Sequence, residues 1–168
     1  MTTPAQKMVA EQLVPHGVTD ERVLRVMAEM PREEFLPSRL RRHAYDDRAL
    51  GIDCGQTISQ PLVVALMTQA VAPKPDESAL EVGAGSGYQA AVLSRLCRRV
   101  ITLEREPALA EHASETLRRL GSQTSRSPSP TGAWAGRRKR RSTSSWSPRQ
   151  RASSRPHWSS SLRKVAAW

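Results

Sequence analysis

The sequence predicts an α/β fold in which a group of helices precedes a parallel sheet. Strand-like and helical patterns alternate between residues 78 and 121, as they do when crossover helices join the strands of a parallel sheet. Residues 4–72 instead carry apolar residues at helical spacing, with prolines between the helical stretches. After Gly121 both patterns end, so the fold is expected to break there.

The N-terminal segment predicts two amphipathic helices. The first begins at Thr3-Pro4, because proline suits the first turn of a helix, and continues to about Leu13. The second is expected to be capped by Thr19, with two acidic residues at its positive end, and to be terminated by Pro31. Its apolar stripe must pack on another element and consists of Val23, Val26, Met27 and Met30.

Residues 35–50 are interrupted by Pro37 and rich in arginine, which predicts a turn and a short helix. A polar loop then leads into a helix that begins at Pro61. The elements of the sheet follow in the order strand "SALEV" (78–82), helix 88–99, strand "VITL" (100–103) and helix 107–121, the last closed by Gly121.

The segment "LEVGAGSGY" is the strongest local signal for a binding site. Gly83, Gly85 and Gly87 lie between a strand and a helix, where glycine permits positive φ and brings backbone N–H groups close to a ligand. An ordinary tight turn is the alternative. The spacing G-x-G-x-G, with Glu81 two residues before the first glycine, differs from the dinucleotide pattern G-x-G-x-x-G. It favours a nucleoside with an amino-acid tail over a pyrophosphate.

An acidic residue, Glu104, follows the second predicted strand, 17 residues after Gly87. A carboxylate at this place is able to accept both hydrogen bonds from a ribose diol. The alternative is a surface ion pair with Arg105 or another neighbour.

These motifs resemble those of the protein-L-isoaspartate O-methyltransferase family, and the resemblance covers residues 8–121 almost without gaps. "GQTISQP" is more specific than the glycine loop, because other methyltransferases with this fold do not carry it there. The similar segments are "MVAEQLVPHGVTDERVLRVMAEMPREEFLP", "AYDDRAL", "GQTISQPLVVALMTQ", "LEVGAGSGYQAAVLSRL" and "VITLEREPALAEHASETLRRLG".

The resemblance implies a Rossmann-like fold of the class I S-adenosylmethionine-dependent methyltransferases, here truncated after the second strand-helix unit. It implies transfer of a methyl group from S-adenosyl-L-methionine to the free carboxylate of isoaspartyl residues in damaged proteins. The cofactor-binding residues would be Glu81, Gly83, Gly85, Gly87 and Glu104. Another methyltransferase with the same cofactor half is the alternative.

The family places Ser59 at the active site, with Thr57 beside it; a capping role for Ser59 in the helix that follows is the alternative. A carboxylate with a pKa of about 3.9 is already ionised at pH 7, so no general base is required. None of the four histidines belongs to a plausible catalytic triad, which agrees with this. Catalysis then depends on positioning, which contributes about 7 to 11 kcal/mol in well-oriented reactions.

Cysteine usage and hydropathy argue against a disulfide-stabilised, a metal-binding and a membrane-spanning protein. Cys54 and Cys97 lie far apart without partner histidines, so neither a disulfide framework nor a metal site is indicated, and a cytoplasmic location is expected. No apolar stretch approaches the roughly 20 residues of a membrane span. The expected partners are proteins or peptides that contain isoaspartyl residues, and the expected state is a monomer.

The net charge of +10 belongs to the C-terminal part of the chain. Residues 1–120 hold 15 basic and 16 acidic residues, whereas residues 121–168 hold 11 basic residues, no acidic residue and 13 serines. Such a composition offers little with which to build a core. The predicted organisation is thus a helical segment (1–72) with the TISQP loop, the first half of an α/β domain (73–121), and a basic, disordered tail (122–168).

The tail regains the family pattern if it is translated from one base earlier. Residues 122–131 then read A-N-V-E-V-A-V-A-D-G, residues 133–147 read L-G-W-P-E-E-A-P-F-D-V-I-V-V-A, and residues 156–167 read P-L-V-E-Q-L-A-E-G-G-R-L, with wobble bases chosen to fit. The hypothesis is a frameshift after about Gly121. The alternative is a basic arm that binds nucleic acid, with Trp134, Trp146 and Trp158 stacking on bases.

A frameshifted tail leaves the "SALEV" strand with "VITL" as its single partner, and we expect irregular structure beyond about residue 121. Parallel strands need neighbours on both sides, and domains are stable by only about 5 to 15 kcal/mol. The chain is therefore expected to be poorly soluble or molten and to have little methyltransferase activity.

Overall fold

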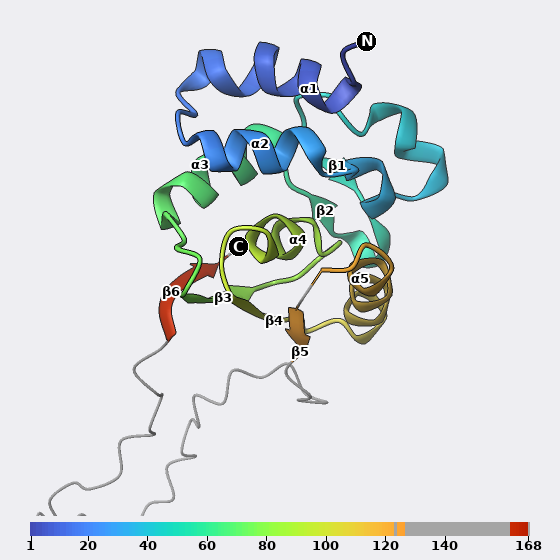
Figure 1. Ribbon diagram of the computed structural model, residues 1–168. Helices are drawn as coiled ribbons and strands as arrows, with labels where there is room; N and C mark the ends of the chain where they lie inside the picture. Colours follow the sequence, from blue (N-terminus) through green and yellow to red (C-terminus); the bar gives the residue numbers. More distant parts are fainter. Residues whose placement is uncertain (123, 127–161, 168) are drawn as a thin grey trace, which may run out of the picture.

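The computed structural model describes residues 1–122, 124–126 and 162–167. Figure 1 shows the N-terminal helices over one side of a sheet, with α4 between them and the sheet. The elements in chain order are α1 (Pro4–Met8), the π-helical η1 (Val9–Leu13), the 3-10 helix η2 (Val14–His16), α2 (Glu21–Glu29), the 3-10 helices η3 (Arg32–Phe35) and η4 (Ser38–His43), β1 (Leu50–Gly51), the 3-10 turn η5 (Asp53–Gly55), β2 (Thr57–Ile58), α3 (Pro61–Val71), β3 (Ser78–Val82), α4 (Tyr88–Ser94), β4 (Arg99–Leu103), α5 (Pro107–Arg119), β5 (Thr124–Arg126) and β6 (Leu162–Ala167).

The two predicted N-terminal helices are present, and the first begins as predicted. Thr3 and Gln6 form a capping box at the start of α1, each side chain accepting a hydrogen bond from the backbone N–H of the other. The expected cap of α2 is wrong by one residue. Asp20 is the cap, its carboxylate accepting from the backbone N–H of Arg22 at 2.9 Å, because Thr19 is engaged by α3 instead.

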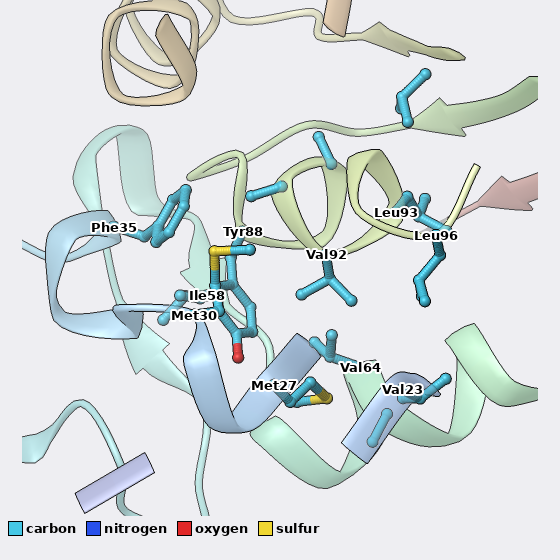
Figure 2. Packing of buried hydrophobic residues seen from close by; sticks show 14 of the residues in the cluster. Val23, Met27, Met30, Phe35, Ile58, Val64, Tyr88, Val92, Leu93 and Leu96 are labelled. Atoms are coloured by element: carbon cyan, nitrogen blue, oxygen red, sulfur yellow. The ribbon is translucent and has the colours of Figure 1, made fainter. Parts of the chain in front are cut away.

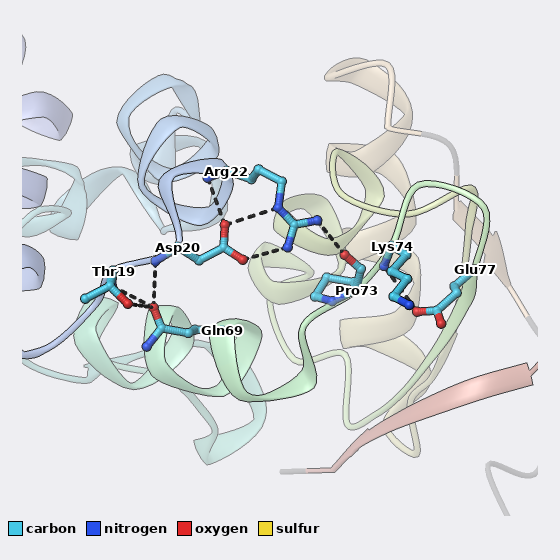
Figure 3. Close-up of polar contacts among 7 residues, drawn as sticks. All are labelled: Thr19, Asp20, Arg22, Gln69, Pro73, Lys74 and Glu77. Atoms are coloured by element: carbon cyan, nitrogen blue, oxygen red, sulfur yellow. Dashed lines mark hydrogen bonds and ion pairs between the residues drawn. The ribbon is translucent and has the colours of Figure 1, made fainter.

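A polar cluster fixes the start of α2 to α3 and to the loop before β3 (Figure 3). Gln69 on α3 accepts hydrogen bonds from the backbone N–H groups of Thr19 and Asp20, at 2.7 and 2.8 Å. Arg22 pairs with Asp20 and also donates to the carbonyl of Pro73 at 2.9 Å. The N-terminal helices are therefore joined to the α/β part by directed bonds as well as by apolar packing.

The core lies between the N-terminal helices and α4 (Figure 2). Val23 and Met27 of α2 are fully buried, as the helical stripe predicts, and lie toward Val64 of α3 and Val92 of α4. Each such side chain contributes about 1.5 to 3 kcal/mol on burial. Phe35 of η3 and Tyr88 of α4 meet edge to face in the same core, with ring centroids 5.4 Å apart.

The main sheet is parallel, with strand order β5-β4-β3-β6. The predicted strands are confirmed: β3 and β4 pair from Ser78 opposite Arg99 to Val82 opposite Leu103. Helix α4 is shorter than predicted and ends at Ser94 rather than at residue 99. The reason is that the chain must turn back into the sheet there, and the N–H of Arg98 already donates to the Glu77 carbonyl beside β3.

The expectation of irregular structure beyond about residue 121 is wrong for two segments. Residues 124–126 form β5, which pairs with β4, and residues 162–167 form β6, which pairs with β3. β3 thus has a partner on each side, which satisfies backbone groups that an open edge would leave unpaired. Residues 127–161, including the three tryptophans of the nucleic-acid alternative, lie outside the described residues, and so does the predicted disorder there.

Helix α5 ends as the sequence predicts, at a glycine. Gly121 has φ of 65°, its N–H donates to the carbonyl of Arg118, and the N–H of Ser122 donates to the carbonyl of Leu117. This pair of bonds is a Schellman motif, which satisfies carbonyls at the helix end. Within the described ranges, every helix is too short or too polar to cross a bilayer.

Candidate functional site

The predicted site residues surround a cavity of about 550 Å3 at the carboxyl ends of β3 and β4. Ligands of open α/β sheets bind at this end of the strands. The walls are formed by the loop after β3, the end of β4, and the segment from β2 to α3. All predicted residues except Gly87 line the cavity, namely Thr57, Ser59, Glu81, Gly83, Gly85 and Glu104.

The glycine loop is anchored to the end of β4. The N–H groups of Gly83 and Ala84 both donate to the carbonyl of Leu103, at 2.8 and 3.1 Å. A Cβ on Gly85 would lie 3.9 Å from the Ile52 side chain, so the loop also approaches the segment before β2. The amides of Gly83 and Ala84 are therefore used within the protein, and the φ values of Gly83 and Gly85, 92° and 52°, are ones that favour glycine.

Gly87 has a different position from the one the motif suggests. It does not line the cavity, and a Cβ there would lie 3.1 Å from the Cβ of Ala113 and 3.4 Å from the side chain of Leu117, both on α5. Its φ is 87°, which side chains rarely adopt. Gly87 therefore lets α4 begin in close contact with α5.

Glu104 is held by backbone N–H groups. One carboxylate oxygen accepts from Gly85 at 2.8 Å, and the other accepts from Arg105 at 2.7 Å and from Glu106 at 2.9 Å. The expected alternative of an ion pair with Arg105 is wrong, because the Arg105 guanidinium pairs with Glu106 at 3.2 Å. Carboxylate oxygens have about four lone-pair sites in total, so Glu104 keeps acceptor capacity toward the cavity.

Glu81 is completely buried and lines the cavity. Thr102 on β4 donates a hydrogen bond to Oε2 of Glu81, while Oε1 has no hydrogen-bond partner among the described residues. Burial raises the pKa of Glu81 to about 8; the Thr102 hydrogen bond opposes this rise and the charge of Glu104 adds to it. At neutral pH Glu81 is therefore mostly protonated and uncharged.

Ser59 lies between β2 and α3. Strand β2 pairs with β1, with Leu50 opposite Ile58, and this short antiparallel ladder carries Thr57 and Ser59 to the cavity. The capping alternative for Ser59 is wrong, because α3 begins at Pro61 with no side-chain cap. The backbone carbonyl of Ser59 is instead held by Arg32, whose Nη2 donates to it at 2.7 Å.

The sequence did not point to Arg32, Tyr88 or Gln89. Tyr88 and Gln89 begin α4 and line the cavity, and both are buried. Gln89 donates to the Thr68 hydroxyl at 2.8 Å, but its Oε1 and the Tyr88 hydroxyl have no hydrogen-bond partner in the described part of the chain. In the sequence, Tyr88 and Gln89 stand out only by their proximity to the glycine loop. Helical periodicity alone assigns both residues to the core.

The parallel sheet, the glycine loop after β3 and the acidic residue after β4 together define the Rossmann-like fold of the class I S-adenosylmethionine-dependent methyltransferases. The family model of protein-L-isoaspartate(D-aspartate) O-methyltransferase matches residues 4–131. The chain belongs to this family.

Curated relatives agree with the family model. A protein-L-isoaspartate O-methyltransferase of Herpetosiphon aurantiacus is 53% identical over 116 residues, which are 69% of this chain and 52% of the relative. One from Bradyrhizobium sp. is 51% identical over 120 residues, 71% of this chain and 56% of the relative. The chain spans about half the length of the curated relatives it matches.

Two solved structures are similar. One is a protein-L-isoaspartate O-methyltransferase with a TM-score of 0.64 and 31% identity, over 73% of this chain and 41% of that chain. The other is a Plasmodium falciparum chain named as a beta-aspartate methyltransferase, in complex with S-adenosyl-L-homocysteine. It has a TM-score of 0.56 and 29% identity, over 68% of this chain and 55% of that one.

Proposed function

We propose that the cavity binds S-adenosyl-L-methionine and that residues 1–122 form the cofactor and substrate half of a protein-L-isoaspartate(D-aspartate) O-methyltransferase. Its substrates would be damaged proteins or peptides with isoaspartyl residues, and it would act as a cytoplasmic monomer in protein repair. One observation carries the proposal: Thr57 and Ser59 line the same cavity as Glu81, Glu104 and the glycine loop.

The residues present fit this cofactor. Glu104 follows β4 directly with acceptor capacity for a ribose diol, and Gly85 brings no side chain into the cavity that it lines. Glu81 offers a buried oxygen with no partner in the described part of the protein. Buried polar atoms are normally hydrogen-bonded, so this unsatisfied oxygen is consistent with a polar ligand.

When bound, S-adenosyl-L-methionine supplies a sulfonium methyl group, which the isoaspartyl carboxylate takes by displacement to give a methyl ester and S-adenosyl-L-homocysteine. The protein does not need to remove a proton, because the attacking carboxylate is ionised above a pKa of about 4. Ser59 and Thr57 would donate hydrogen bonds that orient this carboxylate. Protonated Glu81 would add no negative charge to the cavity and therefore would not repel it.

The experiment compares this chain with the chain translated after the reading frame has been restored near codon 121. Binding of S-adenosyl-L-homocysteine is measured by calorimetry, and methyl transfer is measured on an isoaspartyl peptide and on its normal aspartyl counterpart. We expect isoaspartyl-specific transfer by the restored protein and much less by this chain. A folded restored protein that binds the nucleoside but methylates neither peptide would overturn the proposed substrate.

We also propose that a frameshift produced residues 122–168. One finding supports it: β5 at residues 124–126 coincides with V-E-V of the restored strand. Sequencing the coding DNA around codon 121 tests this, and a gene that supports no alternative frame would disprove it. Salt-dependent binding of oligonucleotides would favour the nucleic-acid arm instead.

A further inference from the structure

Arg32 is a buried cation with no ion-pair partner among the described residues. Its side chain in η3 is 0% exposed, and its bonds go to backbone carbonyls: Nε donates to Ala44 and Nη2 to Ser59, both at 2.7 Å. Burying an unpaired charge is costly, so a residue kept in this state needs compensating contacts. Here those contacts include the carbonyl of the proposed active-site serine.

The same guanidinium also lies over the ring of Tyr88, a residue that lines the cavity. Its central carbon lies 4.7 Å from the centroid of the Tyr88 ring, which is a cation–π arrangement. Tyr88 is the first residue of α4 and follows the glycine loop directly. The Arg32 side chain therefore donates a hydrogen bond to the Ser59 backbone and contacts the ring of the residue after the glycine loop.

We propose that Arg32 is a positioning residue that fixes the Ser59 segment relative to the glycine loop. The proposal rests on the proposed function, because it assigns Arg32 a purpose in presenting Ser59 to the substrate carboxylate. Arginine suits the position because its planar group gives directed donors at its edge and a face for stacking, whereas lysine offers a single point charge. Methionine would fill similar space but leave the carbonyls of Ala44 and Ser59 unpaired.

The test uses the full chain and three variants: Arg32→Met, Arg32→Lys and the control Arg39→Met. Arg39 is exposed and has no polar contact in the described part of the chain. Hydrogen exchange is followed in peptides that cover residues 57–60 and, for comparison, residues 61–71 of α3. Calorimetry gives the affinity for S-adenosyl-L-homocysteine and then, in its presence, for an isoaspartyl peptide.

For Arg32→Met we expect hydrogen exchange to be at least tenfold faster at residues 57–60 and little changed in α3. The affinity for S-adenosyl-L-homocysteine should stay within about threefold of the original, whereas binding of the isoaspartyl peptide should be at least tenfold weaker. Arg32→Lys should recover part of both losses, and Arg39→Met should match the original chain. Equal acceleration of exchange in both segments would overturn the proposal, because Arg32 would then act only as a general core residue.

A further variant covers the case in which Arg32→Met does not fold. Tyr88→Leu removes the ring under the guanidinium and leaves both hydrogen bonds to carbonyls, so residues 57–60 should exchange more slowly in it than in Arg32→Lys. The reverse order would contradict the proposal. If the original chain binds the nucleoside but no isoaspartyl peptide, the proposed substrate fails, whereas the exchange data still decide whether Arg32 anchors Ser59.

Discussion

At the scale of single residues, Glu81 combines full burial with an oxygen, Oε1, that has no hydrogen-bond partner among the described residues. Its pKa of about 8 in the folded chain lies above its ordinary value of 4.5. The folded state therefore keeps a proton that the unfolded state releases between these values. The contribution of this group to stability is complete below about pH 4.5 and is lost as the pH rises toward 8.

We accordingly predict that Glu81→Gln, which stays uncharged at all pH values, will flatten the pH dependence of stability. In the original chain this group should lower the free energy of unfolding by up to about 1.4 kcal/mol for each pH unit between about 5 and 8. Urea unfolding at several pH values measures both proteins. Parallel pH profiles for the two would show that Glu81 is already ionised in the fold.

Ser59→Ala should reduce methyl transfer by about ten- to a hundredfold in the frame-restored protein, the effect of losing one hydrogen bond to a charged group. The Ser59 hydroxyl does not cap α3, so the melting temperature and the affinity for S-adenosyl-L-homocysteine should stay unchanged. Ser38→Ala, at an exposed position on η4, is the control for both measurements. A large loss of stability in Ser59→Ala would indicate a structural role instead.

At the scale of elements, the contact between α4 and α5 depends on Gly87. Gly87→Ala should destabilise the chain by about 1 to 3 kcal/mol, because it combines a strained φ with a Cβ 3.1 Å from Ala113. Gly17→Ala separates the two causes, since Gly17 has φ of 91° and nothing within 4 Å of its added Cβ. Thermal unfolding should show the smaller loss for Gly17→Ala, and equal losses would remove the packing role.

The start of α2 offers a test of which residue caps it. Asp20→Ala should cost about 1 kcal/mol, the usual effect of losing a cap, and also removes the pair with Arg22. Thr19→Val should cost less, because the Thr19 backbone N–H, which it keeps, makes the 2.7 Å bond to Gln69. Urea unfolding of both variants gives the order, and a greater loss for Thr19→Val would support the cap that the sequence suggested.

At the scale of the whole molecule, the sheet depends on a strand far along the chain. Val165→Pro removes the backbone donor of a β6 residue that pairs opposite Leu80, so it should destabilise the protein by at least about 1 kcal/mol. If calorimetry gives the same unfolding free energy for Val165→Pro and the original chain, β6 does not contribute to stability in solution.

The sequence was sufficient to predict the elements whose signals come from residues close together in the chain. The strands at β3 and β4, the glycine loop between them and the Gly121 helix end depend on neighbours within a few residues, and all are found as predicted. Arg32 and β6 could not be predicted in this way. The contacts of Arg32 reach 12 and 27 residues along the chain, and β6 pairs with a strand about 80 residues before it, so only the folded arrangement brings these groups together.

The roles of two polar residues of the site stayed open in the sequence for a related reason. The sequence located Glu104 and Ser59 but left open whether they serve binding or local structure, because an ion pair and a helix cap have the same sequence pattern as a ligand contact. The structure removes both local alternatives: Arg105 pairs with Glu106, and α3 has no side-chain cap. Gly87 shows the opposite case, in which a motif residue serves packing.

The Schellman turn at Gly121 has a practical consequence for how this protein can be divided. Its two bonds to the carbonyls of Arg118 and Leu117 come from the amides of residues 121 and 122, so α5 terminates without help from anything downstream. A cut just after Ser122 would leave an N-terminal fragment that still contains both hydrogen bonds at the C-terminal end of α5. Such a fragment is suited to complementation, in which a separately supplied peptide donates the outer strands and reassembly reports on their pairing.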